Sequence, residues 1–323
     1  MRRPELDIDP YANDPARWGA SLVNDAEILV ACLEAAGARS VLEIGAYAGD
    51  LTGVLLQWAA RSGARVQAVD PSPQPELVAL AEGNPQLELV RATSHEALPT
   101  LELPDAVVVD GDHNYWTVAE ELRLIAQRAG GERLPLLLFH DVCWPHGRRD
   151  DYFAPELVPE EHRQPTHEGG LVFPGDPGIH DGGLLYRFPA AREGGPRNGV
   201  LTAVEDFVAG REGLKLAVVP AFFGLGVVWD ERAPYAAELA GELEPYDRHP
   251  VLECLEANRV LHLAAANHLV QRAARQEAVL RRLLDSKAFM LAERLSRLRH
   301  RAGIATEVSI VSRDEIRRAI EGG

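Results

Sequence analysis

The sequence predicts an α/β fold built on a doubly wound, mostly parallel sheet. From about residue 26 to residue 142, short apolar runs alternate with stretches of helical period. Strands that alternate with helices at this spacing form a parallel sheet with crossover helices on both sides. The run AVVV at 106–109 is uninterruptedly apolar, as is typical of a strand buried on both faces.

The elements can be justified in order. Apolar residues recur at helical spacing from Ala26 to Ala36, and Gly37 then provides a helix stop. A strand at Val41 to Ile44, a glycine-containing turn and an amphipathic helix over about 51–60 follow. The next predicted elements are a strand at 64–70, a helix at 77–84, strands at 87–93 and 105–110, a helix at 117–129 and a strand at 134–142.

Regular patterning stops after Trp144. Residues 145–198 are rich in Gly, Pro, His and Arg, and an irregular stretch of this length inside a compact domain is usually a lid or a binding loop. We therefore interpret it as an insertion that covers the substrate. A helix at 199–210 follows, and two apolar runs within 214–230 predict an antiparallel hairpin that closes the edge of the sheet.

These patterns divide the chain into an N-terminal arm (1–25), an α/β domain (26–247) and a helical extension (248–323). From about residue 249 to residue 300, apolar residues fall three and four apart, which predicts one or two long amphipathic helices. Residues 259–301 carry a local charge of +7, which leaves −23 for the rest of the chain. This asymmetry favours docking of the basic helix on an acidic surface, either of its own domain or of a second subunit in a homo-oligomer. An acidic ligand and a membrane surface are weaker alternatives.

Composition excludes several classes of function. A net charge of −16 disfavours a general nucleic-acid binder, because such a surface repels phosphates. No apolar run is long enough for a transmembrane segment and no secretion signal is present, so we expect a cytoplasmic protein. Cys32, Cys143 and Cys254 lack CxxC spacing and indicate neither disulfides nor a zinc knuckle. Lys215 and Lys287 are the only lysines, so lysine catalysis has almost no candidates.

A glycine-containing turn follows the first strand in VLEIGAYAGD. Glu43 lies at the strand end, and Gly45 and Gly49 let the backbone pass close to a mononucleotide. A dinucleotide site needs GxGxxG, and the bulky Tyr47 disfavours NAD at this turn. Asp70, at the end of the second strand, is placed to accept hydrogen bonds from both hydroxyls of a ribose.

The motifs EIGAYAGD, AVD and RATSHEAL, with the closing hairpin, resemble class I S-adenosylmethionine-dependent methyltransferases over roughly residues 26–230. The resemblance implies a seven-stranded, Rossmann-like sheet and S-adenosyl-L-methionine as cofactor. It also implies that Glu43 contacts the methionine end, Asp70 the ribose and residues 93–95 the adenine side. The expected cofactor-binding residues are Glu43, Gly45, Ala46, Tyr47, Gly49, Asp70, Thr93, Ser94 and Asp110.

A cluster of ionisable residues follows the fourth and fifth strands. Asp110, Asp112, His113, His140 and Asp141 should gather at the carboxyl edge of the sheet, where open parallel sheets bind ligands. Ionisable groups at the ends of buried strands are costly unless they bind a metal, pair with one another or transfer protons.

This cluster resembles the divalent-metal site of metal-dependent O-methyltransferases of the catechol and antibiotic-sugar types. The resemblance assigns a metal, Mg²⁺ or Mn²⁺, to Asp110, His140 and Asp141. His140 departs from the acid usual at that position, and imidazole suits Mn²⁺ or Fe²⁺ better than Mg²⁺. A buried, hydrogen-bonding His140 without a metal is the alternative. His113 or Asp112 would be the catalytic base, and we rank His113 first because its ordinary pKa suits the task.

The sequence thus predicts metal-assisted O-methylation of a hydroxyl on a sugar or aromatic small molecule. The insertion offers residues suited to such an acceptor: Trp144, His146, Arg148, Arg149 and Tyr152. The two arginines either bind an acidic group of the acceptor or pair with Asp150, Asp151 or Glu160 and fold the loop.

Two other interpretations stay open. One is a methyltransferase-like fold with oxidative chemistry, similar to the cephalosporin hydroxylase group, which would need oxygen and a reductant instead of a methyl donor. The other is a noncatalytic scaffold that binds the cofactor and recruits a partner through the helical tail. Deleting the chain beyond about residue 250 would then remove partner binding and leave cofactor binding intact.

Overall fold

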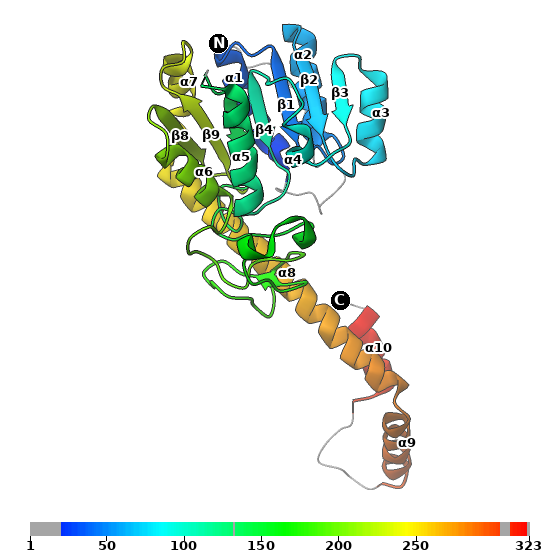
Figure 1. The fold of residues 1–323 in the computed structure, drawn as a ribbon. Helices are drawn as coiled ribbons and strands as arrows, with labels where there is room; N and C mark the ends of the chain where they lie inside the picture. The colour runs from blue at the N-terminus through cyan, green and yellow to red at the C-terminus, as the bar shows by residue number, and fades with distance from the viewer. Residues whose placement is uncertain (1–20, 132, 304–310, 322–323) are drawn as a thin grey trace.

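A computed structural model describes residues 21–131, 133–303 and 311–321 of the chain. Its central sheet has seven strands in the order β3-β2-β1-β4-β5-β9-β8, and β9 alone runs antiparallel to its neighbours (Figure 1). This sheet confirms the predicted fold class. The strands are β1 (Ser40–Ile44), β2 (Arg65–Val69), β3 (Leu87–Val90), β4 (Ala106–Val109), β5 (Leu136–Phe139), β8 (Leu214–Val219) and β9 (Leu225–Asp230).

Helices cover both faces of the sheet, with one apolar core on each side. The first core lies under α1 (Ala26–Ala35), α2 (Asp50–Ser62), α3 (Pro75–Gly83) and α7 (Ala236–Leu243). The second lies under α4 (Ser94–Ala97), α5 (Tyr115–Ala129) and α6 (Val200–Ala209). Side chains of β4 alternate between the two cores, which explains why this strand is apolar at every position.

The predicted hairpin is present as β8 and β9, and β9 is the strand that pairs with β5. Its turn holds Phe222, Phe223 and Gly224 in the left-handed region, with φ of 50°, 70° and 97°. A Cβ on Gly224 would lie 2.5 Å from the sulfur of Cys143, so only glycine allows the turn to approach the end of β5 this closely.

The insertion at 145–198 is folded. It contains two 3-10 turns, η3 (Pro155–Leu157) and η4 (Glu160–His162), and a small antiparallel pair, β6 (Leu171–Val172) and β7 (Leu184–Leu185). Asp150 anchors it, because its carboxylate accepts hydrogen bonds from the backbone N–H groups of Tyr115 and Gly199, at the starts of α5 and α6. Figure 1 shows the insertion below the sheet and alongside α8.

The sequence predicted one or two long helices in the C-terminal region, and the structure has two, α8 (Pro250–Asp285) and α9 (Lys287–Arg301), with a short helix, α10 (Arg313–Glu321). In α8 the buried residues are Glu256, Val260 and Ala264, all in its first half, which packs against the domain. The second half of α8 projects away with α9 and α10 (Figure 1). We call residues 272–301 and 311–321 the projecting arm.

Residues 1–20 of the predicted N-terminal arm lie outside the described part of the chain. Its last residues form a 3-10 turn, η2 (Leu22–Asp25), in which Leu22 and Val23 join the first core. Among the described residues, no helix combines the length and the apolar character needed to cross a bilayer.

Candidate functional site

The turn after β1 passes directly against the end of β4. Gly45 has φ of 86°, and a Cβ on it would overlap the backbone carbonyl of Asp110. Gly49, with φ of 87°, begins α2, and a Cβ there would lie 2.7 Å from the Leu80 side chain. Glycine is therefore required at both positions. Ala46 between them is buried.

Asp70 is held rigidly at the end of β2. Its Oδ2 accepts a hydrogen bond of 2.7 Å from the backbone N–H of Tyr47, and its Oδ1 accepts one of 2.7 Å from Ser72. Each carboxylate oxygen retains a second lone pair, which suits a vicinal diol. The side chain of Tyr47, a residue of this turn, is 63% exposed.

Glu43 is buried beneath the same turn. The hydroxyl of Thr52 donates a 2.6 Å hydrogen bond to its Oε2. Burial raises the pKa of Glu43 to about 8, and the hydrogen bond offsets only part of this shift. The carboxyl group is therefore neutral at pH 7 until a cationic group binds beside it.

The segment after β3 holds Thr93 and Ser94 through their side chains. Thr93 caps α4 in a capping box with Glu96. The Ser94 hydroxyl donates a 2.5 Å hydrogen bond to Glu121, a buried carboxyl of α5 whose other oxygen has no partner among the described residues. Burial raises the pKa of Glu121 to about 8. The sequence analysis missed Glu121 because it falls within an ordinary amphipathic helix.

Four of the five ionisable residues expected at the sheet edge come together. His140 Nδ1 lies 3.0 Å from Oδ1 of Asp110 and 3.4 Å from Oδ2 of Asp141. His113 Nε2 lies 3.1 Å from Oδ2 of Asp141 and 3.7 Å from Oδ1 of Asp110. Each imidazole thus faces two carboxylates. We call these four residues the sheet-edge cluster.

The two carboxylates dominate the electrostatics of this cluster. Burial lowers the pKa of both histidines, but Asp141 and Asp110 reverse this effect and raise the pKa of His140 to about 10 and that of His113 to about 9. Burial likewise opposes ionisation of Asp110, but His140 and His113 lower its pKa below the ordinary value. The cluster therefore favours positive charge between its carboxylates, supplied by protons or by a cation.

Asp112 lies apart from the cluster. Its Oδ2 accepts a hydrogen bond of 2.7 Å from the side chain of Asn114, and its Oδ1 accepts one of 3.0 Å from the backbone N–H of Phe153. Asp112 thus ties the start of α5 to the insertion. Burial raises its pKa.

One segment of the chain is similar to a known family. Residues 42–142, from β1 to just beyond β5, match a family model described as a methyltransferase domain. The match covers less than a third of the chain, and together with the strand order of the sheet it agrees with the predicted class I methyltransferase fold. No curated protein matches the chain in sequence.

Several solved structures are similar to the chain at low identity. An SAH-bound methyltransferase from Podospora anserina has 16% identity, with 68% of this chain and 82% of that chain covered and a TM-score of 0.40. An O-methyltransferase from Bacillus cereus in complex with SAH has 14% identity, with coverage of 71% and 84% and a TM-score of 0.38. A putative caffeoyl-CoA O-methyltransferase from Staphylococcus aureus has 13% identity, with coverage of 64% and 83% and a TM-score of 0.37.

Helix α8 packs against the turn between β8 and β9, next to the sheet-edge cluster. The carboxylate of Glu256 accepts hydrogen bonds from the backbone N–H groups of Phe222 (3.1 Å) and Phe223 (2.8 Å). Arg259 donates two hydrogen bonds to the same carboxylate and lies over the Phe223 ring. The Phe222 carbonyl in turn faces His140 Nε2 at 3.1 Å. A helix outside the segment matched by the family model is therefore linked to His140 through the turn at Phe222.

The insertion residues expected to bind the acceptor are packed against other parts of the fold. Arg148 pairs with Glu205 at 2.7 Å, and Arg149 is fully buried, where it donates to backbone carbonyls including that of Ala190. Their acidic partners are therefore Glu205 and, for Arg149, Glu193 at 3.7 Å, and the pairings expected from the sequence were wrong. Sequence proximity suggested the wrong partners because the insertion folds back on itself and on α6.

The three remaining insertion residues are also packed into the fold. The Tyr152 side chain is fully buried, and its hydroxyl donates to Asp150 and accepts from the backbone of Gln164. Trp144 packs with Phe223 and neighbouring apolar residues between the insertion and α8. His146 is buried beside His113. The structure thus brings one of these five residues, His146, next to the sheet-edge cluster.

Proposed function

We propose that the chain transfers the methyl group of S-adenosylmethionine to a hydroxyl oxygen of a sugar or aromatic small molecule, with assistance from a divalent metal. One observation carries the proposal. The turn at Gly45 lies directly against the backbone of Asp110, so the expected cofactor turn adjoins the sheet-edge cluster. A methyl donor bound over the cofactor turn would have its sulfonium next to the carboxylates and imidazoles of the sheet-edge cluster.

Methyl transfer to oxygen needs in-line alignment and the removal of one proton. The acceptor oxygen forms a bond to the methyl carbon while the carbon–sulfur bond breaks, and the hydroxyl proton passes to His113 Nε2. Asp141, 3.1 Å from that nitrogen, stabilises the imidazolium that forms. His113 suits this role better than Asp112, whose carboxylate oxygens already accept hydrogen bonds from Asn114 and Phe153.

The residues present fit a divalent metal at Asp110, His140 and Asp141, which form a group with ligand atoms within 4.8 Å of one another. The carbonyl of Phe222 only accepts hydrogen bonds, so His140 Nε2 carries the hydrogen and Nδ1 faces the two carboxylates. One imidazole and two carboxylates suit Mn²⁺ better than Mg²⁺. When bound, such a metal supplies Lewis-acid activation of the hydroxyl and offsets the carboxylate charge that keeps His113 protonated.

Calorimetric titration of S-adenosylhomocysteine into the metal-stripped protein, repeated with Mg²⁺ and with Mn²⁺, tests both parts of the proposal, cofactor binding and metal binding. We expect micromolar binding in each state and a separate heat change when Mn²⁺ is added. Absence of S-adenosylhomocysteine binding in every state would contradict the methyltransferase function. Cofactor binding without any metal binding would contradict the metal-assisted part of the proposal.

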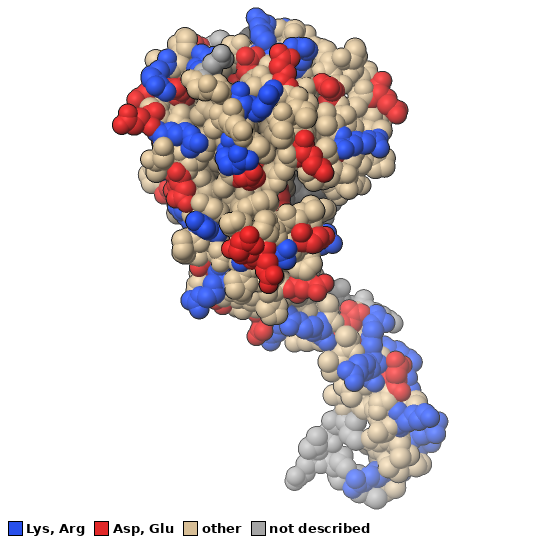
Figure 2. All heavy atoms as spheres, in the orientation of Figure 1, with Lys and Arg blue, Asp and Glu red and all other residues tan. Residues whose placement is uncertain are grey.

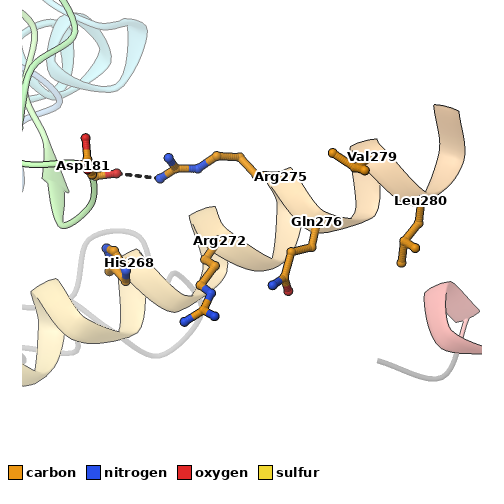
Figure 3. Close-up of a pocket in the computed structure, with 7 residues that line it drawn as sticks. All are labelled: Asp181, His268, Arg272, Arg275, Gln276, Val279 and Leu280. Atoms are coloured by element: carbon orange, nitrogen blue, oxygen red, sulfur yellow. Dashed lines mark hydrogen bonds between the residues drawn. The ribbon is translucent and has the colours of Figure 1, made fainter. Parts of the chain in front are cut away.

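A second proposal concerns the projecting arm, which we infer binds a second copy of the chain. Leu291, Leu295 and Leu298 lie on one face of α9 and are all more than half exposed. Basic side chains prevail around them, as Figure 2 shows, whereas the rest of the chain is strongly acidic. A groove of about 680 Å³ runs along α8 and is lined by residues that include Arg272, Arg275 and Val279, of which Arg275 donates a hydrogen bond to the backbone carbonyl of Asp181 (Figure 3). An apolar, basic arm on an acidic chain complements a second copy of itself.

Light scattering of the protein as it elutes from a size-exclusion column gives its molar mass and thereby measures this association. We expect a dimer for the unmodified chain and a monomer for the Leu295→Glu variant. His300→Glu is the matched control, because His300 is an exposed residue on the opposite face of α9 and the substitution adds the same charge. A monomeric unmodified chain, or loss of the dimer in the control as well, would contradict the assignment to this face.

A further inference from the structure

A second group of potential metal ligands lies beside the sheet-edge cluster. It consists of His113, Asp141 and His146, whose ligand atoms lie within 4.8 Å of one another. It shares Asp141 with the group formed by Asp110 and His140 but reaches into the insertion through His146. The rings of His113 and His146 lie 4.8 Å apart, centroid to centroid.

His146 is held firmly in this position. Its side chain is only 4% exposed, and its backbone carbonyl accepts a 2.8 Å hydrogen bond from Val200 at the start of α6. Its ring packs edge-on against the ring of Tyr186, with centroids 4.7 Å apart. The imidazole is therefore fixed by the insertion and by α6.

Two buried nitrogen atoms in this group lack hydrogen-bond partners among the described residues. They are Nδ1 of His146 and Nε2 of His113. The latter lies 3.1 Å from Asp141 Oδ2, but the direction of this contact does not make a hydrogen bond. Buried polar atoms are normally paired, so two unpaired nitrogens beside one carboxylate call for a ligand.

The residue types in this group indicate which metal ion it would bind. Two imidazoles and one carboxylate are a ligand set that Zn²⁺ uses, whereas Mg²⁺ and Ca²⁺ prefer oxygen atoms.

We propose that His113, Asp141 and His146 form a binding site for Zn²⁺ or a similar borderline transition metal. Zn²⁺ at this site occupies the His113 nitrogen that receives the proton in the methyl transfer, so it would inhibit turnover. That consequence rests on the proposed function, but the metal site itself does not. Because Asp141 belongs to both groups, filling one weakens binding at the other.

Competition with a chromophoric zinc chelator, on the metal-free full chain at pH 7.5, measures the site. We expect one tightly bound Zn²⁺ per chain and an affinity loss of about tenfold or more for His146→Ala and for His146→Gln. Asp110→Asn removes a ligand of the other group alone, although Asp110 lies 3.7 Å from His113, and it should change zinc affinity by no more than about threefold. The matched control is His167→Ala, because His167 is an exposed histidine of the same insertion.

Two results would overturn the site: no zinc binding by the unmodified chain, or a larger loss in Asp110→Asn than in the His146 variants. S-adenosylhomocysteine binding is measured on the same samples, both as a test of folding and as a separate test of function. A chain that binds S-adenosylhomocysteine but no zinc refutes this site alone. A chain that binds zinc but not S-adenosylhomocysteine refutes the methyltransferase proposal and leaves the metal site standing.

Discussion

The Asp141→Asn variant is expected to lose methyl transfer by a factor of about 10³ or more, while its affinity for S-adenosylhomocysteine stays within about threefold. Asp141 lies within 3.4 Å of both histidines of the sheet-edge cluster and belongs to both potential metal groups. An amide at this position neither stabilises an imidazolium nor provides a carboxylate ligand. Asp110→Asn should behave in the same way, because Asp110 completes the group with His140.

The Asp141→Asn substitution should leave the backbone conformation unchanged. Asp141 has φ of 58°, and asparagine adopts this left-handed conformation as readily as aspartate does. Turnover with a methyl-acceptor panel, S-adenosylhomocysteine calorimetry and thermal unfolding would be measured together. Asp181→Asn is the matched control, since Asp181 is exposed and distant from the cluster. Loss of S-adenosylhomocysteine binding in Asp141→Asn with an unchanged unfolding temperature would mean that cofactor and metal do not occupy separate sites.

Local sequence patterns were sufficient to predict the sheet. Alternation of apolar strands and amphipathic helices gave five of the seven strands and most helices, since burial on one or two faces imposes a period that can be read along the chain. The last pair was predicted from two apolar runs around a turn, although its order in the sheet, with β9 next to β5, required the structure. The sheet edge was equally predictable, because parallel strands bring their carboxyl ends together.

The surroundings of the site were less predictable, because they depend on contacts between distant segments. Arg149 and Tyr152 have the composition expected of an acceptor pocket, yet both are buried within the insertion. Asp150 is the residue that fixes the insertion, through backbone groups 35 and 49 positions away. Asp25, buried in η2, lies near enough to His140 to influence its pKa, but the sequence placed it in an arm.

Glu256 is the most important residue near the site that the sequence analysis missed. Its substitution is the second major prediction. Glu256 lies 33 and 34 positions from the two phenylalanines whose N–H groups it binds, within a helix that the sequence set apart as an extension. Glu256→Leu should lower the free energy of unfolding by about 3 kcal/mol, because it leaves Arg259 and two backbone N–H groups without their charged partner. It should also weaken Mn²⁺ binding by about tenfold, since the turn that holds His140 loses its anchor.

The effect on stability and the effect on Mn²⁺ affinity can be separated with variants of residues on α8. Glu256→Gln keeps an oxygen acceptor and should recover part of the stability and of the Mn²⁺ affinity, whereas Glu253→Gln, at an exposed position one turn earlier, should change neither. Chemical unfolding and Mn²⁺ calorimetry give the two readouts. Lost stability with unchanged Mn²⁺ affinity would show that α8 only packs on the domain. Loss of both in Glu256→Leu, with partial recovery in Glu256→Gln, would show that α8 positions His140, in which case the chain cannot be cut at residue 250 without damaging the site.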